Sequence, residues 1–149
     1  MSTITLKFGL VFFWGLWLGM VLLNNVFEGL RAFRILPPYW KFASNNLQVI
    51  RQAAGRYHAP LWVPNVLFLG VLLWQGGTLV LFGRALVLFL ETGELVLGAI
   101  NLAFASSIAL IAAFIVADEV FQLYELEHIH VLYLIAHVVT LLALHVMPT

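Results

Sequence analysis

Acidic and histidine side chains gather near the C-terminal end of this 149-residue chain, where four of the five histidines follow residue 127. Glu127 and His130 are three residues apart, a spacing that places a carboxylate and an imidazole on one helix face, as in bundles that hold iron or manganese. Oxygen and imidazole ligands suit a transition metal. The residues that we predict as candidate metal ligands are Glu28, His58, Asp118, Glu119, Glu127 and His130.

The histidines also permit a b-type haem as the cofactor. Two imidazoles must approach the iron from opposite sides, which two residues of one helix cannot do. The axial pair would therefore join His58 to His130 or His137. A structural role competes with both cofactor hypotheses, because the same side chains can cap helices and form interhelical hydrogen bonds. The sequence favours this structural role, since a di-metal bundle needs a Glu-x-x-His step on each of two helices. Here both such steps, Glu125/His128 and Glu127/His130, lie on one helix.

The amino-acid composition indicates the environment in which the chain folds and in which these residues must lie. Hydrophobic residues make up 63% of the chain and charged residues 9%, against about 45–50% and about 25% in soluble domains. A chain of this length folded in water could not bury so much apolar surface. We therefore expect an integral membrane protein. A net charge of zero argues against nucleic-acid binding, and the absence of cysteine excludes disulfides and thiolate chemistry.

Four stretches are long and apolar enough to cross a bilayer as helices, which needs about 20 residues each. They cover residues 8–27, 61–82, 95–117 and 126–146. The apolar stretch 84–90 is too short to span, and we expect a turn at the interface there. The sequence thus predicts an all-α, four-helix transmembrane bundle that forms a single domain over residues 1–149.

The long segment between the first two spans predicts a further helix at about residues 38–54. Pro37 and Pro38 stop the first helix and can open the next one. Apolar residues then recur at Ala43, Leu47 and Ile50, a spacing typical of one helix face. We expect this amphipathic helix to lie flat in the interface between spans 1 and 2.

The positions of the basic residues predict how the chain is oriented in the membrane. Five of the seven lie between the first and second spans, which places that loop in the cytoplasm and both termini on the non-cytoplasmic side. The loop before the fourth span then faces the cytoplasm too. This topology would gather the candidate metal ligands at the cytoplasmic end of the bundle.

Small residues mark surfaces where membrane helices can approach closely. Gly15 and Gly19 form a GxxxG step in the first span, and the third span carries an alanine ladder at four-residue spacing: Ala105, Ala109, Ala113 and Ala117. Packing within the bundle is the simpler interpretation of this ladder, and contact with another subunit is the alternative. Most of the five tryptophans are expected to face lipid or anchor the interface. The amides Asn24, Asn25, Asn65, Gln75 and Asn101 are expected to form interhelical hydrogen bonds.

Together these features favour a non-enzymatic role. We expect a small accessory or scaffold subunit whose partners are the lipid bilayer and other membrane subunits or further copies of itself. The alternative is a membrane redox protein that binds a metal or haem through the Glu/His cluster. A third hypothesis is proton or small-solute transport by an oligomer.

Overall fold

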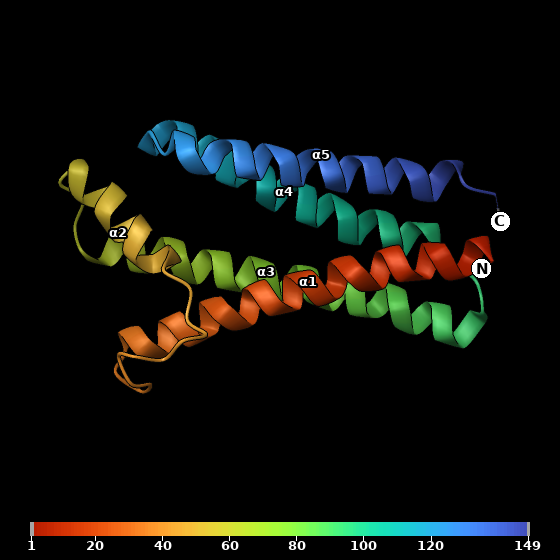
Figure 1. The fold of residues 1–149 in the computed structure, drawn as a ribbon, viewed down its shortest axis with the longest axis horizontal. Helices are drawn as coiled ribbons and strands as arrows, with labels where there is room; N and C mark the ends of the chain where they lie inside the picture. The colour runs from red at the N-terminus through yellow and green to blue at the C-terminus, as the bar shows by residue number, and fades with distance from the viewer. Residues whose placement is uncertain (1, 149) are drawn as a thin grey trace. The chain divides into compact units, whose positions relative to one another are not determined.

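A computed structural model describes residues 2–148, most of which are helical. The helices are α1 (Thr3–Ala32), α2 (Asn46–Arg56), α3 (Trp62–Thr92), α4 (Leu97–Phe121) and α5 (Tyr124–Val146), as labelled in Figure 1. All except α2 are long and apolar enough to cross a membrane, and residues 2–148 contain no strand. The chain is therefore an all-α, multi-pass membrane protein, and the predicted four-helix transmembrane fold with a short helix after the first span is confirmed.

Two of the predicted boundaries are wrong. Residues 84–90 form no turn but continue α3, which runs unbroken to Thr92. Arg, Ala and Leu all favour helix, and the chain turns only at Gly93, whose φ of +71° suits glycine. The short helix begins at Asn46 rather than near residue 38. The preceding residues are held outside a helix because the Ser44 amide donates to the carbonyl of Asn24, at 3.1 Å.

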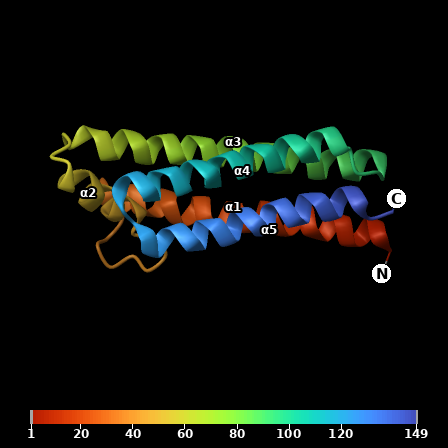
Figure 2. The same cartoon turned by 90° about the horizontal axis from the view of Figure 1, so that it is seen from above.

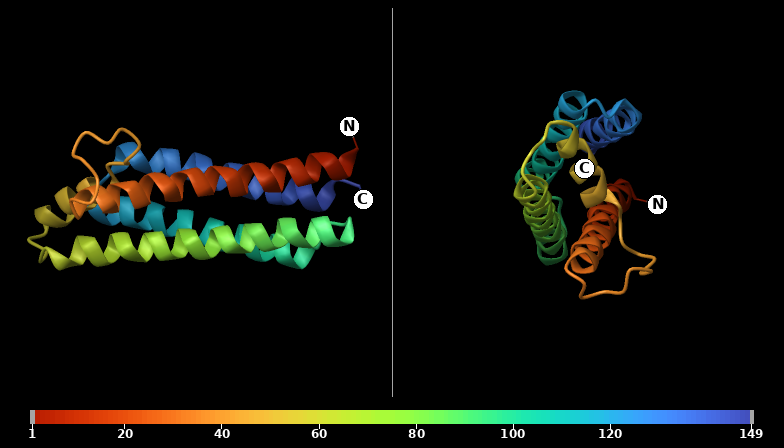
Figure 3. Two further views of the ribbon diagram at one scale, coloured as in Figure 1. Left: turned by 90° about the horizontal axis from the view of Figure 1, so that it is seen from below. Right: turned by 90° about the vertical axis from the view of Figure 1, so that its left-hand side faces the viewer.

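The chain forms two compact units, each of which contains part of α1 and part of α3. The first unit comprises residues 18–76. It holds the C-terminal half of α1, the loop 33–45, α2 and the N-terminal half of α3. Figure 3 shows this loop beside the end of α1. Gly29 of α1 faces Phe68 of α3, since a Cβ added to Gly29 would lie 3.6 Å from the Phe68 ring.

The second unit comprises residues 1–17 and 77–149. In it α4 and α5 pack together as an antiparallel hairpin. The N-terminal part of α1 runs alongside α5 (Figure 2). Phe82 and Phe104 are fully buried and meet edge to face, with 5.2 Å between ring centroids. A Cβ at Gly15 would lie 3.3 Å from the Cβ of Phe82, so glycine lets α1 approach α3 closely here.

Helices α1, α2 and α4 end in the same way, on a non-glycine residue with positive φ: Arg34 (+60°), His58 (+53°) and Gln122 (+55°). At each of these ends, backbone amides donate hydrogen bonds to carbonyl oxygens in the last turn of the helix. Leu123 N, for example, bonds Asp118 O at 2.8 Å, while Gln122 N bonds Glu119 O at 3.2 Å. This is the Schellman arrangement, which satisfies the last free carbonyls of a helix. His58, a candidate metal or haem ligand, therefore occupies a helix-terminating position.

Candidate functional site

A polar cluster in the first unit, buried at Asn25, Glu28 and Gln75, fixes the start of α2. We name its members, Asn25, Glu28, Ser44, Asn46 and Gln75, the α2 anchor. Asn25 Nδ2 donates to Gln75 Oε1 at 3.0 Å, which joins α1 to α3. Asn25 Oδ1 accepts from Asn46 Nδ2 at 2.8 Å and lies 2.7 Å from the Ser44 hydroxyl. The predicted interhelical amide hydrogen bond is thereby confirmed for Asn25 and Gln75.

Glu28 caps α2 from another helix. Its side chain is only 3% exposed. One carboxylate oxygen lies 2.5 Å from the Ser44 hydroxyl, and the other accepts from the Gln48 amide at 3.3 Å. The residue at the N-cap position, Asn45, makes no side-chain cap of its own. A negative charge at a helix N-terminus interacts favourably with its free N–H groups. The geometry therefore gives Glu28 a positioning role.

Arg31 completes this attachment from the last turn of α1. Its guanidinium donates to the Ser44 carbonyl at 3.0 Å and to Asn45 Oδ1 at 3.1 Å. Sequence reasoning missed both contacts because it placed residues 44 and 45 on the polar side of an amphipathic helix. The one signal that pointed here was the group of amides near the end of the first span.

In the second unit, His137 is buried with Ser107 and Trp14, and the half-buried Thr140 lies beside them. The imidazole Nδ1 lies 2.8 Å from the Tyr133 carbonyl oxygen, which can only accept, so Nδ1 carries a proton. In a neutral imidazole, Nε2 then accepts from the Ser107 hydroxyl at 3.0 Å, which joins α4 to α5. Both ring nitrogens therefore have partners in this chain, and binding a haem iron at Nε2 would break the Ser107 bond.

Trp14 is an exception to the expectation that most tryptophans face lipid or the interface. Its ring packs on His137, with 3.8 Å between centroids, and is only 7% exposed. Its indole N–H donates to Thr140 Oγ1 at 3.1 Å. Trp14 is buried because its polar edge finds an acceptor on α5, which a lipid chain cannot supply.

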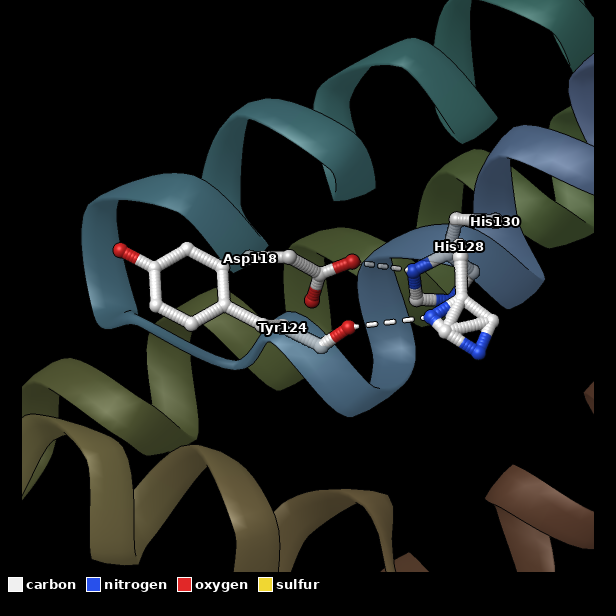
Figure 4. Close-up of polar contacts among 4 residues, drawn as sticks. All are labelled: Asp118, Tyr124, His128 and His130. Carbon is white, nitrogen blue, oxygen red and sulfur yellow. Dashed lines mark hydrogen bonds and ion pairs between the residues drawn. The ribbon is translucent and has the colours of Figure 1, made fainter.

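Asp118 of α4 and His130 of α5 are hydrogen-bonded to each other beside the turn that joins the two helices (Figure 4), and we call them the Asp–His pair. His130 Nδ1 faces Asp118 Oδ2, and the imidazole packs against Phe114 at 5.2 Å between centroids. Nε2 has no hydrogen-bond partner in the described part of the chain. A carboxylate that orients one ring nitrogen and leaves the other free is typical of histidines that bind a metal.

The remaining candidate ligands are placed differently. Glu119 and His58 are exposed and Glu127 is half-buried, while the oxygens of Glu28 contact Ser44 and Gln48. His128 is exposed, and its Nδ1 lies 3.3 Å from the Tyr124 carbonyl oxygen (Figure 4). No group of three or more histidine and acidic side chains within residues 2–148 is arranged to hold a metal ion. The metal and haem sites stay predictions.

The alanine ladder faces outward. Ala105, Ala109 and Ala113 are exposed and Ala117 is half-buried, whereas Ala103 and Ser107 of the same helix are buried. Other helices of this chain therefore leave these three alanines uncovered. Gly15 does pack internally, against Phe82, and Gly19 is half-buried.

No family model, curated protein or solved structure matches this chain.

Proposed function

We propose that this protein is an accessory subunit that docks into a larger membrane assembly through the outward face of α4. The observation that carries the proposal is the exposure of Ala105, Ala109 and Ala113. These residues, with the half-buried Ala117, define the ladder face. Residues on the opposite side of α4, such as Phe104 and Ser107, already pack inside the chain.

Helix association in a bilayer gains nothing from hydrophobic burial, because lipid tails are as apolar as the helices. Small side chains instead let two backbones approach closely and gain dispersion contacts. From residue 105 to residue 117 the ladder face extends about 18 Å along the helix axis. This length exceeds half of a hydrocarbon core about 30 Å thick. A partner helix could follow the ladder face for several turns.

The other polar groups support a structural role. The polar groups of the α2 anchor and of His137 form hydrogen bonds with other residues of this chain. Four apolar helices account for most of residues 2–148, so contact with a partner would take place mainly within the membrane. We further propose that the Arg-containing loop after α1 faces the cytoplasm, which leaves both termini on the other side.

The test is the mass of the protein extracted in a mild detergent. We expect the wild type to form a particle much heavier than its 16.7 kDa chain. Ala109→Leu combined with Ala113→Leu should reduce it to the single chain, because leucine side chains keep a partner backbone away. Val80→Phe and Val139→Phe are matched controls, since they add bulk at exposed positions of α3 and α5 and should leave the mass unchanged.

Two outcomes would contradict the proposal. One is a wild-type particle that is strictly monomeric and co-purifies with nothing. The other is a heavy particle that the double leucine variant leaves intact, which would place the interface elsewhere.

The Asp–His pair favours a second candidate, a redox subunit that binds a metal or haem. His130 Nε2 is the atom that would bind the iron or other metal, and further ligands would have to come from outside the groups described above. Elemental analysis and a visible spectrum of the purified protein test it. Stoichiometric metal or a Soret band would support a redox role, and a colourless, metal-free, folded protein would remove it.

A further inference from the structure

A cavity of about 160 Å³ lies between the C-terminal part of α3 and the N-terminal part of α4, both in the second unit. Its walls are mainly aliphatic, and one charged side chain, that of Arg84, lines it. The aliphatic lining includes Leu81, Leu88, Val96, Ala99 and Leu102. One water-sized group occupies about 30 Å³, so the cavity has room for a short run of methylene groups.

Arg84 is the only charged residue of α3 before Glu91. It is exposed, and its guanidinium makes no hydrogen bond or ion pair with the described residues. Arginine keeps its charge in any protein environment, and a cation near hydrocarbon is costly unless it reaches an anion or water. The five N–H donors of Arg84 therefore require acceptors from outside the chain.

A helix as long as α3, centred in the bilayer, would place Arg84 near the lipid headgroups. Its 31 residues extend about 46 Å, so a helix centred in a hydrocarbon core of about 30 Å projects about 8 Å beyond each edge. Arg84 precedes the last residue of α3 by about 12 Å of helix. Its Cα then lies about 4 Å inside the hydrocarbon edge, from which an arginine side chain reaches the phosphate layer.

We propose that Arg84 and this cavity bind one phospholipid with an anionic headgroup. The guanidinium would hold a phosphate oxygen pair in the bidentate geometry that arginine favours. The first part of an acyl chain would enter the aliphatic cavity. A single ligand then satisfies both features, because a phospholipid carries its phosphate next to its apolar chains. This site is independent of the ladder face and of the Asp–His pair.

The experiment measures bound lipid by native mass spectrometry. The full-length protein is taken from vesicles of equal parts phosphatidylcholine and phosphatidylglycerol. We expect one retained phosphatidylglycerol on the wild type and about fivefold less on Arg84→Gln, the change expected for one basic side chain near an anionic surface. Arg56→Gln removes an exposed charge that does not line the cavity, and it should retain lipid like the wild type.

A second variant separates the cavity from the charge. Gly98 lines the cavity, and a Cβ added there meets nothing within 4 Å. Gly98→Leu should fill the cavity, keep Arg84 and still lower lipid retention severalfold. Circular dichroism should show unchanged helix content in each variant.

Three results would overturn the proposal. The first is equal lipid retention by the wild type and Arg84→Gln. The second is an equal loss from Arg56→Gln, which would indicate non-specific attraction to charge. In the third, inorganic phosphate added to the wild type displaces the lipid completely, which would assign the site to a free anion.

Discussion

Individual polar residues in this protein are mostly held by partners that are distant in sequence. Glu28 illustrates the point, because its carboxylate contacts residues 16 and 20 positions later in the chain. The carboxylate takes the place of the side-chain cap that Asn45 does not provide. Its residue type and its position near the membrane edge were visible in the sequence and drew attention as a candidate ligand. Glu28 can accept these hydrogen bonds only because of the path that the loop 33–45 follows. No local sequence pattern predicts that path.

Removing the Glu28 carboxylate should destabilise the first unit. Glu28→Ala leaves the Gln48 amide and the Ser44 hydroxyl without this acceptor, at an expected cost of about 2 kcal/mol in the free energy of unfolding. Glu28→Gln keeps an acceptor oxygen and should cost less than half as much. Unfolding in detergent micelles measures both values, and Glu91→Ala, at an exposed residue, serves as the control. Equal stability of the alanine and glutamine variants would contradict the capping role.

At the scale of helices, the sequence predicted which helices exist more accurately than where each helix begins and ends. Hydropathy located every spanning helix, because helices in lipid must be long and apolar. It could not show that α3 continues through residues 84–90, since the apolar run was judged by the length needed to span and not by helix propensity. It also could not show the non-glycine terminations at Arg34, His58 and Gln122. Such residues rarely adopt positive φ, so nothing in their types marks a helix end.

The continuity of α3 can be tested with proline. Leu86→Pro removes a helical hydrogen bond and introduces a steric clash, and it should cost about 3 kcal/mol in the free energy of unfolding. Val96→Pro is the control, because Val96 precedes α4 with a φ of −76° that proline accepts. A turn at residues 84–90 would instead tolerate both substitutions. Unfolding in detergent micelles distinguishes these outcomes.

For the molecule as a whole, four spans imply that the loops alternate between the two sides of the membrane. The chain has no cysteine, so an introduced cysteine reports on one position alone. Lys41, Glu94 and Glu125 are exposed residues in or beside three successive connections. Labelling these three positions can therefore show, in the intact protein, whether the number of membrane crossings between them is odd or even.

Cysteines at positions 41 and 125 should react with a membrane-impermeant maleimide from the same side of sealed vesicles. The cysteine of Glu94→Cys should react only from the opposite side, because one spanning helix separates it from each of the others. The basic loop predicts that positions 41 and 125 face the cytoplasm. Reaction of Lys41→Cys and Glu125→Cys from opposite sides would show that the number of crossings between them is odd.

The sequence alone determined that this protein is a membrane protein with four spanning helices. The backbone in lipid must satisfy its hydrogen bonds within each segment, so apolar length dictates the elements. Only the tertiary structure decided how each helix is rotated about its axis. The side chains of α4 itself are apolar on every side of the helix, and such a pattern does not specify which face points inward. Contacts with other helices therefore decided that Ser107 binds His137, that Trp14 is buried and that the alanine ladder is left facing outward.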